Sequence, residues 1–242
     1  MVTRGSSRGD ARSYEFRAYV IFSSLLLLSV LAVKQDVLVQ LESRLAAHMI
    51  VEHAIFFLIG ALSVLSAETI MKLLTLRSAN TPGRGLGPAR LQPLDVWRSM
   101  LRLLYGHIPG VVWIAAAVAL MAFWHLQYFF VLAVLHPQIH ALQHLSFIAV
   151  GAAGFIATRN IGDSFRIALL LLVIGMMGFA GLLFSVLDKP VYPVYTVSDH
   201  NDAGRYMVLV STVLLVVGLP LYLVKRSMAY VRAVHGKRTE GS

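Results

Sequence analysis

The feature that most constrains this chain is a series of apolar runs, each long enough to cross a lipid bilayer as a helix. A spanning helix needs about 20 predominantly apolar residues. Six segments reach or approach that length: 15–33, 46–74, 99–123, 137–158, 164–187 and 204–224. Only 14% of the residues are charged, whereas soluble proteins have about a quarter. We therefore predict an all-α, polytopic bundle of about six transmembrane helices, forming a single membrane domain over 1–242 with the bundle at 15–226.

The distribution of basic residues predicts how this bundle is oriented. Four of the 21 Lys and Arg residues fall in one alternate set of connections, namely Lys34, Arg44, Lys189 and Arg205. The others lie in or beside the tails 1–14 and 227–242, the loop 75–98 and the turn 159–166. Positive residues mark the cytoplasmic side of a membrane protein. Both termini are therefore predicted to be cytoplasmic, and the net charge of +9 indicates topology in a cell membrane, with lipid rather than nucleic acid as the partner.

Several further segments predict local shape and packing. The stretch 126–135 is apolar but too short to span, so we expect a re-entrant or interfacial segment on the outer side. The Gly-x-x-Gly pairs at 151–154 and 175–178 predict helix-packing surfaces, because small residues let membrane helices approach closely. Pro109 is expected to kink the third span, and Gly218 with Pro220 to interrupt the sixth.

The nine histidines are the second constraint, because seven of them fall on or near the outer side of this topology. His136, His140 and His144 are spaced four apart, so all three share one stripe if the helix includes His136. His48 and His53 open another helix but are five apart, which separates them by about 140° unless the opening turn is irregular. Glu52 shares the face of His48.

Depth along the two helices predicts where these imidazoles could meet. His48 and His140 lie near the start of their helices, and His53 and His144 lie about 10 Å from the surface. If the helices are neighbours, the outer mouth of the bundle forms a site of three or four imidazoles. Additional ligands or supporting residues could then come from Met49, Glu52, Asp199 and His200. His107, His125 and His235 are interpreted as ordinary interfacial residues, and the tyrosines of 188–205 as an aromatic belt.

The chain contains no cysteine, so a metal would be held by His, Met or carboxylate ligands. Imidazole without thiolate suits copper, zinc, nickel or iron, and the neighbouring Met49 slightly favours copper(I). Two imidazoles from opposite helices would also suit a b-type haem. A proton- or quinone-handling site and a structural polar network are the remaining alternatives. No nucleophile elbow or paired-carboxylate pattern is present, so an enzyme is expected only through the metal, and a non-enzyme is favoured.

The run 135–147, which reads LHPQIHALQHLSF, resembles a signature of the CtaG family of membrane proteins associated with assembly of caa-type cytochrome c oxidases. Three other parts are similar in order and spacing: AHMIVEH at 47–53, PVYPVY at 190–195, and the series Asp199, Gly204, Met207. The chain departs from the family pattern in that His48 and His53 are five rather than four positions apart, and in having glutamine rather than glutamate at Gln143.

This resemblance implies a function for the histidines. It implies that the protein delivers copper to the copper centre of the oxidase or helps that centre mature, with oxidase subunits as partners. Copper would arrive from the non-cytoplasmic side and meet the imidazole-rich site. A metal-containing membrane redox protein and a structural subunit of a larger membrane complex are the alternatives that the residues themselves leave open.

Overall fold

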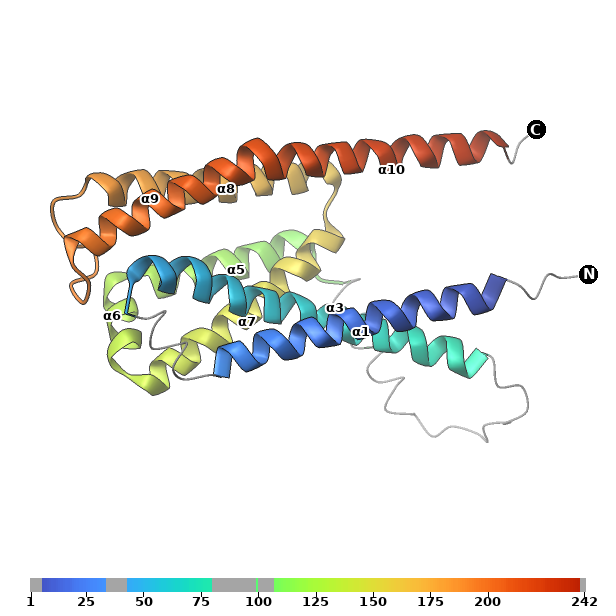
Figure 1. Cartoon of the computed structure of the whole chain (residues 1–242), viewed down its shortest axis with the longest axis horizontal. Helices are drawn as coiled ribbons and strands as arrows, with labels where there is room; N and C mark the ends of the chain where they lie inside the picture. Colours follow the sequence, from blue (N-terminus) through green and yellow to red (C-terminus); the bar gives the residue numbers. More distant parts are fainter. Residues whose placement is uncertain (1–5, 34–42, 80–98, 100–106, 240–242) are drawn as a thin grey trace, which may run out of the picture. The chain divides into compact units, whose positions relative to one another are not determined.

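The structure is a computed structural model that describes residues 6–33, 43–79, 99 and 107–239. Every regular element in these ranges is helical, which confirms the predicted all-α fold. Residue contacts divide the chain into two compact units, 1–162 and 163–242. Figure 1 shows the helices of both units, coloured along the sequence.

The first unit contains five α-helices and one π-helix among the described residues. These are α1 (Ser6–Val33), η1 (Ala47–Glu52), α3 (His53–Ala79), α5 (Gly110–His125), α6 (Gln127–Leu135) and α7 (Pro137–Asn160). Helix α3 packs against both α1 and α7, and α7 also packs against α5 and α6. The short α6 lies at the end of the unit where α3 and α7 begin (Figure 1).

Four described helices are long and apolar enough to cross a membrane: Ala47–Leu73, Pro137–Asn160, Asp163–Val186 and Val197–Arg232. A fifth span is added if α5 and α6 count as one broken helix. The apolar part of α1, Phe16–Val30, is shorter. Membrane character is thus confirmed, whereas six spans and cytoplasmic termini stay predictions. The third predicted span lies partly outside the described residues.

Helix α6 occupies the segment that was predicted to be re-entrant or interfacial. Its axis is bent by 70° from that of α5, and Leu126 between them has an extended backbone. Pro109 does not kink a helix among the described residues, because it directly precedes the first residue of α5. A proline at this position costs little, since the first N–H groups of a helix have no partner within that helix.

The approach of α3 to α7 is unusually close because glycines face each other. A Cβ on Gly60 would lie 2.0 Å from the carbonyl oxygen of Ile148, and one on Gly151 would lie 2.1 Å from that of Phe57. Only glycine fits at such a distance. The predicted packing surface is therefore confirmed at Gly151, whereas Gly154 has open space around its Cβ position.

The two helices run parallel and nearly in register about this contact. Glu52, eight residues before Gly60, contacts His144, which lies seven residues before Gly151. At the other end, Glu68 accepts a hydrogen bond of 3.0 Å from Arg159, and each residue lies eight positions after its glycine. The glycine contact therefore sets which polar residues of the two helices meet.

The second unit contains α8 (Asp163–Val186), α9 (Val197–Val213), η2 (Leu214–Gly218) and α10 (Leu219–Thr239). Gly181 and Gly204 bring α8 and α9 together, since a Cβ on Gly204 would lie 2.5 Å from the Gly181 carbonyl oxygen. Gly218 and Pro220 were expected to interrupt this span, and the regular α-helix is interrupted at Leu214–Gly218. The π-helical turn η2 precedes the proline and lets one helical span continue from Val197 to Arg232.

Large apolar side chains remain exposed along the spans. On α8, Leu172 is 56% exposed and Phe179 is 65% exposed. Contiguous exposed apolar surface of this kind is rare on soluble monomers. It is expected of helices that face hydrocarbon, so the side-chain pattern agrees with the membrane assignment.

Candidate metal centre at the start of α3 and α7

The opening turn of the second predicted span is irregular, because Ala47–Glu52 forms a π-helix. In a π-helix the backbone hydrogen bonds run between residues five apart, so residues with that spacing return to the same side. His48 and His53 accordingly lie with ring centroids 5.4 Å apart, and His53 Nδ1–H donates a 2.7 Å hydrogen bond to the His48 carbonyl oxygen. The separation of about 140° that a regular α-helix would give His48 and His53 is therefore absent.

Glu52 is the centre of the polar cluster and is 1% exposed. Its Oε2 lies 2.7 Å from His48 Nδ1, one turn earlier on the same helix. Its Oε1 lies 3.4 Å from His140 Nε2 and accepts a hydrogen bond from His144 Nε2. One buried carboxylate is thus approached by three imidazoles from two helices.

Helix α7 supplies its two imidazoles through ordinary α-helical spacing. Pro137 occupies the first position of α7, and His140 and His144 follow one turn apart on a single face. Their ring centroids are 4.2 Å apart. This i, i+4 arrangement was predicted from the sequence, and the glycine contact between α3 and α7 turns it toward Glu52.

The cluster could hold a metal ion. His48, Glu52 and His140 each offer one ligand atom, and these atoms all lie within 4.8 Å of one another. Imidazole and carboxylate are the ligand types of zinc and copper sites without thiolate. An imidazole binds a metal through a ring nitrogen that carries no proton.

Aromatic side chains surround the cluster and keep it largely away from solvent. Phe130 of α6 lies edge-on to His48, with centroids 5.1 Å apart, and is fully buried. Phe56 stacks on His144 at 4.0 Å. Exposure rises from 1% for the His48 side chain to 9% for His140 and 14% for His144. His144 is therefore the side of the cluster nearest to solvent.

His53 belongs to a neighbouring ring cluster rather than to the carboxylate. Its centroid lies 4.1 Å from that of Phe147 and 5.6 Å from that of His125. His125 is held by its own hydrogen bond of 2.7 Å, from Nδ1–H to the Met121 carbonyl oxygen. His53 and His144, which the sequence places at the same depth, contact different aromatic rings: His53 lies beside Phe147 and His144 stacks on Phe56.

Several buried polar atoms near the start of the two helical spans have no hydrogen-bond partner among the described residues. They are Nε2 of His48, Nε2 of His53 and both amide atoms of Gln143, which is fully buried. A buried polar atom without a partner costs about 1–3 kcal/mol. Such a set is expected where a ligand, an ion or ordered water completes the site.

Of two further candidate ligands in the first unit, His136 lies outside the group and Met49 directly follows His48 in the chain. His136 precedes α7 as its N-cap with an extended backbone, and its side chain is exposed. The predicted stripe of three histidines therefore contains only His140 and His144. Met49 is half-buried in the π-helix.

The candidates of the second unit, Asp199 and His200, have local structural contacts. Asp199 forms a capping box with Thr196 at the start of α9. His200 is fully buried, donates from Nδ1 to the Thr196 carbonyl oxygen at 2.8 Å, and accepts at Nε2 from the Tyr192 N–H at 3.1 Å. Both ring nitrogens of His200 are therefore used to tie the loop before α9 to the helix.

The tyrosines of that loop are not an exposed belt. Tyr192 and Tyr195 are 3% and 8% exposed. The Tyr192 ring stacks on His200 with centroids 5.9 Å apart, and Phe184 lies beside both rings. Burial raises the pKa of Tyr192 to about 12.

Sequence reasoning underestimated two residues near the cluster. Gln143 attracted notice only as a departure from a family pattern, although its position three residues after His140 placed it on the same helix face. His125 was interpreted as an interfacial residue, although the segment 126–135, expected to be re-entrant or interfacial, begins directly after it and is where α5 bends into α6. Glu52, a secondary candidate, is the residue on which the imidazoles converge.

No protein-family model matches this chain, and no curated protein or solved structure matches it.

Proposed function

We propose that this protein is a copper-binding membrane protein that helps to assemble or metallate a cytochrome c oxidase, with copper as its cargo. The observation that carries the proposal is the group formed by His48, Glu52 and His140, whose ligand atoms lie within 4.8 Å of one another. This group combines two borderline nitrogen ligands with one anionic oxygen ligand. Such a set suits copper or zinc. Iron–sulfur clusters and thiolate centres need cysteine ligands, and the chain contains no cysteine.

The resemblance to the CtaG family supports copper among these metals. The residues that carry the resemblance, 47–53 and 135–147, are the two segments that the glycine contact brings together. The five-residue spacing of His48 and His53 departs from the family pattern, but the π-helix at Ala47–Glu52 accommodates the additional residue. Single π-helical turns within longer helices occur frequently at functional sites.

Partial access at the His144 side fits a protein that takes up and releases its cargo. Three ligands leave a metal coordinatively unsaturated, so a ligand from an accepting protein could attach before the first ligands leave. In the proposed route the ion enters past His144, which is the most exposed of the three imidazoles, and reaches the deeper His48. With the predicted topology this entrance is on the non-cytoplasmic side.

The experiment that tests the proposal is metal titration of the purified protein in detergent, with copper(I), copper(II) and zinc. We expect the wild type to bind copper and the variant His140→Ala/His144→Ala to lose that binding while remaining helical. The matched control is His107→Ala/His136→Ala, which removes two exposed histidines and should bind as the wild type does.

Each alternative has its own result. Equal copper binding by the wild type and His140→Ala/His144→Ala would overturn the metal centre. A Soret absorption band in the purified protein would identify haem instead. Normal copper binding combined with a normal copper content of the oxidase in cells that lack this protein would overturn the assembly function alone.

A further inference from the structure

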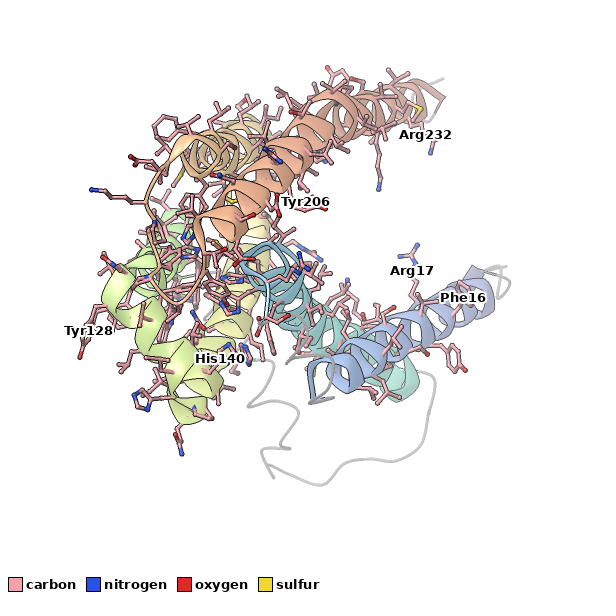
Figure 2. The ribbon with its side chains drawn as sticks, turned by 60° about the vertical axis from the view of Figure 1, so that its left-hand side comes forward. Phe16, Arg17, Tyr128, His140, Tyr206 and Arg232 are labelled. Atoms are coloured by element: carbon pink, nitrogen blue, oxygen red, sulfur yellow. The ribbon has the colours of Figure 1, made fainter. Side chains whose placement is uncertain are left out.

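The first unit has a second polar cluster at the end opposite to the metal centre. Glu68 lies 16 residues after Glu52 on the same helical span, so the two carboxylates are about 24 Å apart along the axis. A groove of about 400 Å³ opens there between α1, α3 and α7. Figure 2 shows Phe16 and Arg17 of this groove on α1, well away from His140.

The charge of this groove is positive. Among the described residues, the side chains that line it include three cations, Arg17, Lys72 and Arg159, and one carboxylate, Glu68. Glu68 is paired with Arg159 at 3.0 Å. The described lining residues, three cations and one carboxylate, together carry a formal charge of +2. A site with this balance favours an anionic ligand.

The cations also share one depth in the membrane. Arg17 lies at the start of the apolar stretch Phe16–Val30, Lys72 near the end of the span Ala47–Leu73, and Arg159 near the end of Pro137–Asn160. Each therefore stands where a hydrophobic segment meets its polar flank, which is the level of the lipid headgroups.

The remaining lining is apolar and lies deeper. Val20 is one turn into α1 from Phe16, and Leu65 is two turns before Lys72 on α3. Both line the same groove. The Thr69 hydroxyl donates to the Leu65 carbonyl oxygen at 2.8 Å, so it adds no free donor to the apolar part. The groove is thus cationic at the level of the lipid headgroups and apolar deeper in the membrane, which is the order of headgroup and acyl chain in a phospholipid.

We infer that this groove is a binding site for an anionic phospholipid, with the phosphate against Arg17, Lys72 and Arg159 and the start of an acyl chain along Val20 and Leu65. Basic pockets between transmembrane helices bind acidic lipid headgroups in this way. The volume is in the range of small-molecule sites. The positive-inside prediction places this end at the cytoplasmic leaflet, where anionic lipids are concentrated. This inference does not depend on the copper proposal.

The test is competitive lipid binding to the purified full chain in an equimolar mixture of phosphatidylglycerol and phosphatidylcholine. Lipids that remain bound are quantified by mass spectrometry. A surface cation contributes about a fivefold preference for an acidic lipid. We expect the wild type to be enriched in phosphatidylglycerol by about tenfold or more, and Arg17→Gln/Lys72→Gln to lose most of that enrichment while copper binding stays unchanged.

The matched control is Lys225→Gln/Arg232→Gln, which removes the same charge from exposed positions of α10. It should keep the wild-type enrichment. Equal enrichment in Arg17→Gln/Lys72→Gln and the wild type would overturn the inference, as would an equal loss in the control. Displacement of the lipid by inorganic phosphate at equal concentration would show a phosphate site rather than a lipid site. A Leu65→Trp variant, which fills the apolar part without changing charge, is expected to lower total lipid retention.

Discussion

Gly60 of α3 and Gly151 of α7 bring the two helices so close that a Cβ on either one would collide with the backbone of the other helix. The metal centre depends on this relationship, because it sets the register in which Glu52 meets His140 and His144. The same register aligns Glu68 with Arg159 at the other end.

Substitution of either glycine is expected to separate the helices and weaken the metal centre. Gly60→Leu should lower the stability of the folded bundle by about 1–3 kcal/mol, the usual cost of overpacking, and should reduce copper affinity as well. Unfolding in detergent and copper titration measure the two effects. Gly154→Ala is the control, because nothing lies within 4 Å of its Cβ position; a loss of the same size there would contradict the packing argument.

Glu52→Gln is expected to remove the anionic ligand while keeping the size of the side chain. Copper affinity should fall by about 10- to 100-fold, the range seen when groups that support a metal site are lost, whereas helix content should not change. Competition against a calibrated chelator gives the affinity. The control is Glu68→Gln, a carboxylate of the same helix outside the metal centre, and unchanged affinity in Glu52→Gln would exclude Glu52 as a ligand.

Copper binding is expected to weaken in acid, because an imidazole binds a metal only in its neutral form and is protonated as the pH falls. Affinity should fall by about tenfold per pH unit for each proton displaced. Titrations at a series of pH values, with proton release measured in weakly buffered solution, check this expectation. Binding that is independent of pH and releases no protons would contradict the exchange of proton for metal.

His200→Ala is expected to destabilise the second unit without changing copper binding. The substitution leaves the Tyr192 N–H and the Thr196 carbonyl oxygen without their partner and opens a cavity beside Tyr192, which together cost about 2–4 kcal/mol. Thermal unfolding and copper titration separate the two outcomes. Asp202→Asn, in an exposed pair with Arg205 at 3.7 Å, serves as the control, and lost copper binding in His200→Ala would make His200 a ligand after all.

Tyr192 is expected to contribute to alkaline unfolding. Burial raises its pKa to about 12 from about 10 in an unfolded chain, so the folded protein favours the protonated phenol. The contribution is complete below about pH 10 and is lost as the pH rises through 12. Tyr192→Phe should therefore lose less stability over that interval than the wild type. Tyr206→Phe, at an exposed tyrosine, should behave as the wild type does; the same pH dependence in all three proteins would contradict the assignment.

The helical class and the membrane character could be predicted from the sequence, because both follow from local composition along one segment at a time. The same is true of the facing pair His140 and His144, whose spacing alone determines that they share a helix face. His48 and Glu52 likewise are four residues apart, and no distant contact is needed to bring them together.

Only the tertiary structure decided what these faces meet. The adjacency of α3 and α7 depends on Gly60 and Gly151, which are 91 positions apart in the chain, and no local pattern reports which helix approaches a given glycine. The π-helix at Ala47–Glu52 depends on packing in the same way, since propensity alone favours a regular helix. The burial of Tyr192 and His200 could not be predicted from the sequence either, because it depends on how the helices and loop of the second unit pack together. Local spacing thus determined which side chains share a face, and long-range packing determined the single carboxylate on which they converge.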